Sequence, residues 1–175
     1  MSFFARMPVR PLFGALCLMV AAAAPAMADV IQIPAPAFSR QCPCEFESAP
    51  AIETKGSITP SSGASSYFAA VPFVGAGQVC SMSMIYRDVN EAEALTVSLF
   101  RKRILLGSAV DAGRDLMARA VSAGGTPDAV RKADAPTIKV SPINSSKAFY
   151  YVQADFRNVN MDLVGVQIDI RQSCL

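Results

Sequence analysis

The feature that most constrains the fold of this chain is an alternation of apolar and polar side chains near its C-terminus. Apolar residues occupy every second position over 150–156, and residues 164–171 repeat the pattern. A period of two places successive side chains on opposite faces of a strand, so each segment predicts a β-strand with one buried face. In the second segment the predicted core face consists of Val164, Val166, Ile168 and Ile170. The turn residues 158–160 predict that the two strands form a hairpin or are antiparallel neighbours.

Upstream segments show the same period over shorter lengths. Alternation predicts strands at 67–73, 79–86, 95–100 and 137–141. The segment 111–123 fits a helical period as well as a strand, and we favour the strand because every neighbouring segment indicates β-structure. A series of short alternating strands predicts an all-β fold, a single antiparallel β-sandwich of jelly-roll type.

Residues 1–28 have the pattern of a secretory signal peptide. Arg6 and Arg10 precede an uncharged apolar run, and Ala26-Met27-Ala28 provides the small residues of a cleavage site. We expect an exported protein, located in the periplasm or outside the cell of a bacterium. The remaining sequence has no apolar stretch near the length of about 20 residues that a membrane-spanning helix needs, so we expect no membrane insertion.

The segment 29–66 differs from the rest in its many prolines and serines, and we interpret it as an irregular N-terminal arm ahead of a β-sandwich domain at 67–175. The arm opens with the apolar run 30–33, which predicts a short edge strand. Such a strand can complete the sheet of a neighbouring molecule. A subunit of a surface assembly that forms oligomers by strand addition is therefore one functional alternative.

Four cysteines follow the predicted signal peptide, namely Cys42, Cys44, Cys80 and Cys174. An even number in an exported chain predicts two disulfides. A bond between Cys42 and Cys44 would close a strained loop around one proline. We therefore expect both to pair with Cys80 and Cys174, in one of the two possible arrangements. The competing interpretation is a redox-active or copper-binding pair formed by Cys42 and Cys44.

The chain contains no histidine. This excludes Ser-His-Asp and Cys-His catalysis as well as zinc sites that need imidazole. The neighbouring acids Asp88, Glu91 and Glu93, and the pair Asp111 and Asp115, fall in turn-like, solvated segments, where we interpret them as surface charge. We expect a non-catalytic protein without a cofactor or metal.

Charge and surface composition point to a binding or structural module. The predicted signal peptide holds two of the 16 basic residues, so the remainder balances the 14 acidic ones, and we expect no nucleic-acid partner. The polar phases of the two C-terminal strands supply side chains that suit a carbohydrate or protein partner. The candidate binding residues are Tyr151, Gln153, Asp155, Gln167, Asp169 and Arg171.

Overall fold

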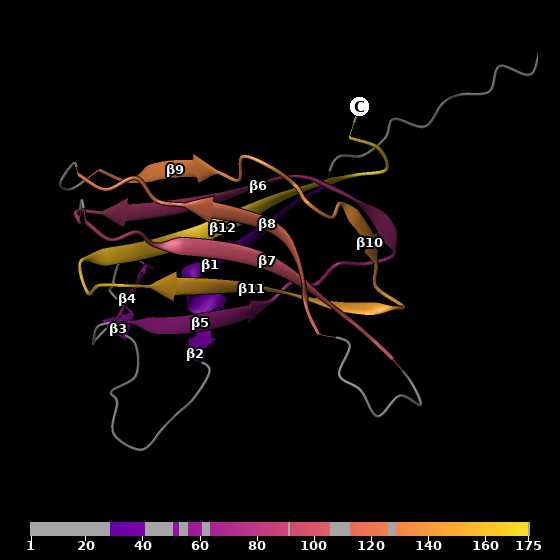
Figure 1. Ribbon diagram of the computed structural model, residues 1–175, viewed down its shortest axis with the longest axis horizontal. Coiled ribbons are helices and arrows are strands. Elements are labelled where there is room, and N and C mark those ends of the chain that lie inside the picture. Colours follow the sequence, from indigo (N-terminus) through magenta and orange to yellow (C-terminus); the bar gives the residue numbers. More distant parts are fainter. Residues whose placement is uncertain are drawn as a thin grey trace, which may run out of the picture.

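The structure is a computed structural model in which two antiparallel β-sheets pack face to face (Figure 1). It describes residues 29–40, 51–52, 56–60, 64–90, 92–105, 113–125 and 129–174. The predicted all-β sandwich is confirmed. In the part of the chain that the structure describes, no helix is long and apolar enough to cross a membrane.

The first sheet is built around two long antiparallel strands, β6 and β12. Among the described residues its strands are β1 (Asp29–Pro34), β3 (Ala51–Ile52), β4 (Ile58–Thr59), β6 (Ala76–Asp88), β9 (Arg131–Asp134), β10 (Pro142–Asn144) and β12 (Met161–Arg171). Strands β9 and β10 pair with the outer edge of β6, and β1 and β4 pair with the outer edge of β12. The apolar run 30–33 thus forms an edge strand, as predicted, and it lies in the sheet of its own chain.

The second sheet has the strand order β2-β5-β11-β7-β8 and lies in front of the first sheet in Figure 1. Its strands are β2 (Ser39–Arg40), β5 (Ser65–Ala70), β7 (Thr96–Arg103), β8 (Asp115–Val121) and β11 (Ala148–Phe156). A 3-10 helix, η1 (Ala35–Ala37), leads the chain from β1 in the first sheet to β2 in the second. The described parts of the arm therefore contribute strands to both sheets, and they are more regular than the prolines indicated.

The inner faces of both sheets form one hydrophobic core. Its largest fully buried side chains include Tyr67, Phe156, Met82, Leu99 and Ile168. Tyr67 and Phe156 meet edge to face, with ring centroids 5.4 Å apart. The apolar phases predicted for β5, β7 and β11 all point into this core, because a strand in a two-layer sandwich is solvated on its other face only.

Within the described strands, three β-bulges interrupt the alternation that the sequence pattern assumes. Met117 is an extra residue on β8 opposite β7, so Met117 and Ala118 are both buried. This bulge explains why 111–123 fitted two periods, and the strand we favoured is confirmed over the described part of that segment. A second bulge leaves Val164 half-buried and places Leu163 in the core instead, which corrects the predicted face of β12. The third lies at Cys80 on β6.

Two predicted features of the C-terminal half are wrong. Strands β11 and β12 belong to different sheets, so residues 157–160 cross from one layer to the other and do not close a hairpin. The segment 137–141 is not a strand: it makes a single bridge, between Ile138 and Ala118, on its way from β9 to β10. The Lys139 N–H donates to Met117 O at 2.7 Å, so this segment spans one open side of the sandwich.

The observed disulfide contradicts both connectivities that we favoured. Cys80 bonds Cys174 with a Cα–Cα distance of 5.2 Å. The two cysteines come together because β6 and β12 are neighbours in register, with Gln78 opposite Arg171. Neither of them is available to Cys42 or Cys44, both of which lie outside the described residues. The Cys80–Cys174 pairing belongs to the connectivity that we set aside because it also joins Cys42 to Cys44 across one proline.

Candidate binding face

The six predicted surface residues do not form one surface. Tyr151, Gln153 and Asp155 lie on β11, on the outer face of the second sheet. The other three, Gln167, Asp169 and Arg171, lie on β12 in the first sheet, so the core separates the two groups.

On the first sheet, Arg171 forms an ion pair with Asp169. Its Nη2 lies 2.7 Å from Asp169 Oδ2, and the hydrogen bond from Arg171 to this carboxylate raises the pKa of Arg171. Gln167 is half-buried between β1 and β6, with which β12 is paired on either side. This group offers a ligand little beyond an ordinary solvated sheet face.

The second sheet carries a group of aromatic rings on its outer face. Tyr151 stacks on Phe100 with ring centroids 5.4 Å apart, and the Phe68 ring lies 6.0 Å away on the other side. Phe149, two residues before Tyr151 on the same phase of β11, is 67% exposed. We refer to Phe68, Phe100, Phe149 and Tyr151 as the aromatic face.

A connected set of polar groups lies against the aromatic face. The Arg114 guanidinium lies 4.3 Å from the centre of the Phe100 ring and donates a 2.7 Å hydrogen bond to Gln153 Oε1. Gln153 Nε2 in turn donates to Asp155 Oδ1 at 2.7 Å, and the Ser66 hydroxyl donates to the same oxygen. The bonds orient the Gln153 amide and the Asp155 carboxylate beside the rings, which fixes their positions before any ligand arrives.

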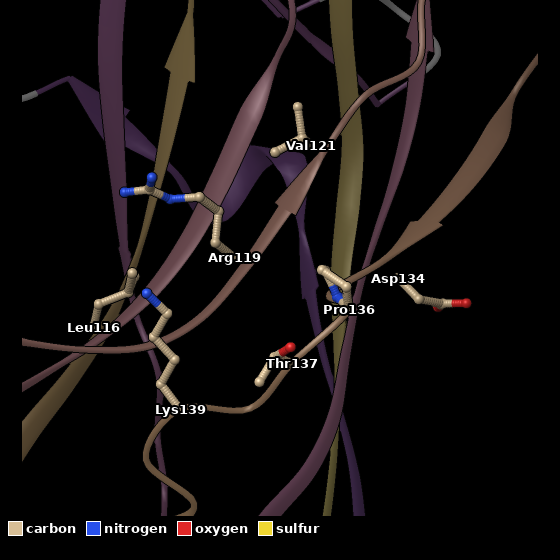
Figure 2. Close-up of a pocket in the computed structure, with 7 residues that line it drawn as sticks. All are labelled: Leu116, Arg119, Val121, Asp134, Pro136, Thr137 and Lys139. Atoms are coloured by element: carbon tan, nitrogen blue, oxygen red, sulfur yellow. The ribbon is translucent and has the colours of Figure 1, made fainter.

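Two depressions border this surface. The first depression, at the β2 side of the aromatic face, is lined by Ser39, Arg40, Phe68, Ala69, Ala70, Lys102, Arg114 and Tyr151. The second depression, at the β8 edge of the same sheet, is lined by Leu116, Arg119, Val121, Asp134, Pro136, Thr137 and Lys139 (Figure 2). In Figure 2 the Arg119 and Lys139 side chains extend toward the side formed by Leu116, whereas the Asp134 carboxylate lies beyond Pro136.

The carboxylates near the two depressions have partners of their own. Arg101 donates to Asp115 at 2.7 Å, and this bond, together with the charge of Arg103, lowers the pKa of Asp115. A hydrogen bond from Ser83 lowers the pKa of Asp134 in the same way. Both acids are therefore ionised at neutral pH and held in place.

One of the acids that we interpreted as surface charge is buried. Asp88 is 0% exposed, and its carboxylate accepts hydrogen bonds from the Ser122 hydroxyl and the Asn90 N–H. The Ser122 hydroxyl oxygen also accepts the Leu95 N–H at 2.8 Å. Asp88 thus joins β6 to the ends of β7 and β8, which is a structural role. Its supposed partner Glu91 lies outside the described residues.

No metal centre is found in the described residues, which contain no group of three or more Cys, Asp or Glu side chains placed to hold an ion. Asp111, the remaining predicted acid, lies outside them.

Sequence reasoning found Tyr151, Gln153 and Asp155 but missed their neighbours. Phe68 stands opposite Gln153, and Phe100 stands opposite Tyr151, only once the register of β5, β11 and β7 is known. Arg114 precedes β8 and reaches across β7 to β11, which no local pattern indicates.

Comparison with known proteins identifies no relative by sequence. No family model and no curated protein matches the chain. Among solved structures, a family two carbohydrate esterase from Cellvibrio japonicus is similar over 83% of this chain and 35% of its own length, with 8% sequence identity and a TM-score of 0.42. This chain therefore spans about a third of that protein.

Proposed function

We propose that this protein is an exported, non-catalytic binding module whose aromatic face recognises a carbohydrate. The observation that carries the proposal is the set of aromatic rings on the solvated side of the second sheet, with Phe149 67% exposed and Tyr151 half-buried beside it. Tyrosine and phenylalanine rings present flat apolar surface that matches the C–H face of a sugar ring. Exposed apolar surface of this kind on a soluble domain typically marks an interaction site.

The polar groups around the rings support a sugar ligand over a purely apolar one. Gln153, Asp155 and Arg114 offer both donors and acceptors, and their mutual bonds leave further lone pairs and N–H groups for hydroxyl groups of a ligand. A small number of oriented polar groups beside an apolar surface is the usual composition of a small-molecule site.

The Cys80–Cys174 bond and the signal-like sequence at 1–28 support export, because disulfides persist in oxidising compartments. The absence of histidine from the sequence supports a non-catalytic role.

The test is affinity measurement by calorimetry against a panel of purified polysaccharides, with wild-type protein and two variants. Tyr151→Ala should weaken binding at least tenfold. Loss of a central aromatic contact costs on the order of 1.4 kcal/mol of binding free energy, which corresponds to that factor. The matched control, Gln167→Ala on the opposite face, should bind like wild type. Release of reducing ends during incubation would contradict the non-catalytic role, and unchanged affinity in Tyr151→Ala would contradict the proposed face.

One observation favours a second candidate function, which is thiol–disulfide exchange or the binding of a soft metal ion. Because Cys80 and Cys174 are bonded to each other, Cys42 and Cys44 have no other cysteine of the mature chain to pair with. Two thiolates one residue apart suit a soft ion such as Cu(I). Peptide mapping without reductant, followed by Cu(I) titration of native protein, tests this candidate. Stoichiometric binding that Cys42→Ser/Cys44→Ser abolishes would support it, and an inert Cys42–Cys44 disulfide would exclude it.

A further inference from the structure

Basic side chains border the aromatic face on both sides. Arg40, Lys102 and Arg114 line the first depression, and Arg119 and Lys139 line the second. No carboxylate belongs to the lining of the first depression as far as the described residues define it. Arg114 and Arg119 donate to neutral acceptors, the Gln153 amide and the Ser98 hydroxyl, so these bonds leave their charges uncompensated.

An apolar path joins the two depressions. Tyr151 on β11 stands opposite Phe100 on β7, and Phe100 stands opposite Leu116 on β8. Phe100 is 7% exposed and its ring lies beneath Arg114, so Tyr151 and Leu116 offer the accessible apolar surface of this path. Tyr151 lines the first depression, and Leu116 lines the second. Strands in a sheet are spaced by about 4.8 Å, so the path from β2 to β8 crosses about 19 Å. A compact monosaccharide would not cover this length, whereas several linked sugar units would.

Two described acids of this region, Asp115 and Asp134, are engaged with cations that line neither depression. Asp115 is paired with Arg101 and Arg103, and Asp134 is paired with Lys132. Figure 2 shows the Asp134 carboxylate on the side of the second depression away from Arg119. In the described part of the chain, Arg114, Arg119 and Lys139 therefore outnumber Asp134, the one acid in the two linings.

Asp155 is a further acid near the path. It lies two residues beyond Gln153 on β11, opposite Ser66 and Thr96, and it is not part of either lining. Its carboxylate accepts from Gln153 and Ser66, which are neutral, so it presents negative charge at one border of the face. An anion on the path across Tyr151 would be repelled by it.

We infer that the ligand of the aromatic face is an acidic polysaccharide, bound across the strands with its carboxylates toward the basic residues of both depressions. This inference rests on the proposed function. Arginine forks suit carboxylates, and the accessible rings of the aromatic face, Phe149 and Tyr151, suit the apolar faces of the sugar units. Charge complementarity identifies this ligand class among carbohydrates, because only an acidic glycan gains Coulomb attraction from Arg114, Arg119 and Lys139 in addition to hydrogen bonds.

The test compares polygalacturonate and alginate with their methyl-esterified forms, in which the same sugar chains lack the charges. The acidic forms should bind wild-type protein about tenfold or more tightly than the esters at low ionic strength, and the difference should shrink as salt is added. Affinity for the acidic form should also rise with oligomer length until the chain reaches both depressions.

Single substitutions test whether the preference for acidic polymers depends on this face. Arg114→Gln and Lys139→Gln should each weaken binding of the acidic polymers about two- to fivefold, and Asp155→Asn should strengthen it by a similar factor. Arg171→Gln, an arginine on the opposite sheet, is the matched control and should bind like wild type. Far-UV circular dichroism confirms that each variant is folded before binding is measured.

The possible failures are distinguishable. Equal binding of acids and esters would overturn this inference and leave the proposed function intact, as would binding of neutral glycans alone. If no glycan binds, the proposed function itself fails. Equal or tighter binding of polyglutamate or single-stranded DNA would also overturn the inference, because the face would then select charge without selecting sugar.

Discussion

Removal of the Cys80–Cys174 bond should destabilise the protein by an amount that follows from the length of chain it closes. The two cysteines are separated by 94 residues, and the chain-entropy model assigns a loop of this length about 4.7 kcal/mol of stabilisation at 25 °C. The bond acts mainly on the unfolded state, because β6 and β12 are neighbours in the sheet with or without it. A double Cys80→Ser/Cys174→Ser variant should therefore keep its fold and lose most of its margin of stability.

Urea denaturation of oxidised protein, followed by far-UV circular dichroism, measures the effect. The free energy of unfolding should fall by about 3 to 5 kcal/mol, which lowers the thermal midpoint by about 10 to 20 °C. The slope of the free energy against urea should rise, because the unfolded chain without its cross-link exposes more surface.

The control is the double variant Cys42→Ser/Cys44→Ser, which should be destabilised far less. A loss below about 1 kcal/mol in Cys80→Ser/Cys174→Ser would refute the reasoning, since a bond that closes so long a loop cannot be removed without effect. A larger loss in the Cys42/Cys44 variant would show that the stabilising disulfide lies elsewhere.

Three further predictions concern single side chains. Ser122→Ala removes the hydroxyl that donates to buried Asp88 and should cost about 1 to 3 kcal/mol in urea denaturation, and a loss below the experimental error would contradict the buried network. Gly165→Val places a side chain where a Cβ would already meet the Ile33 carbonyl oxygen at 3.0 Å, so it should speed hydrogen exchange in β1, and unchanged exchange would contradict this packing. Because the Arg101 hydrogen bond lowers the pKa of Asp115 below 3.8, ionised Asp115 stabilises the fold above that pH and this contribution is lost as the pH falls through the lowered pKa. Asp115→Asn should therefore be less stable than wild type at pH 7, with a difference that shrinks below about pH 4, and a difference independent of pH would contradict the pairing.

The elements that were predictable from sequence are those with one clean buried face. Strand β11 was found because every second residue from Tyr150 to Phe156 faces the core. Strand β9 was missed because Ala133 is the one apolar residue of Arg131–Asp134, and the strand is held by backbone pairing with β6. The bulges at Met117 and Val164 shifted core faces by one residue, which no alternation pattern can show.

The candidate face was predictable only in part, for a related reason. Alternation on one strand identified Tyr151 as solvent-facing, but a binding surface on a sheet is assembled from neighbouring strands. Phe68 and Phe100 contact Tyr151 because the strand order is β5-β11-β7. Strand order depends on long-range pairing, which the local pattern of one sequence does not indicate.

The most direct test of the central claim is to map a bound glycan on the protein by nuclear magnetic resonance. During titration with an acidic oligosaccharide, saturable amide shifts should concentrate on β5, β11 and β7 around Tyr151, with the outer face of β12 at Gln167 unaffected. Shifts that concentrate on β12, or an absence of saturable shifts with every glycan tested, would contradict the account.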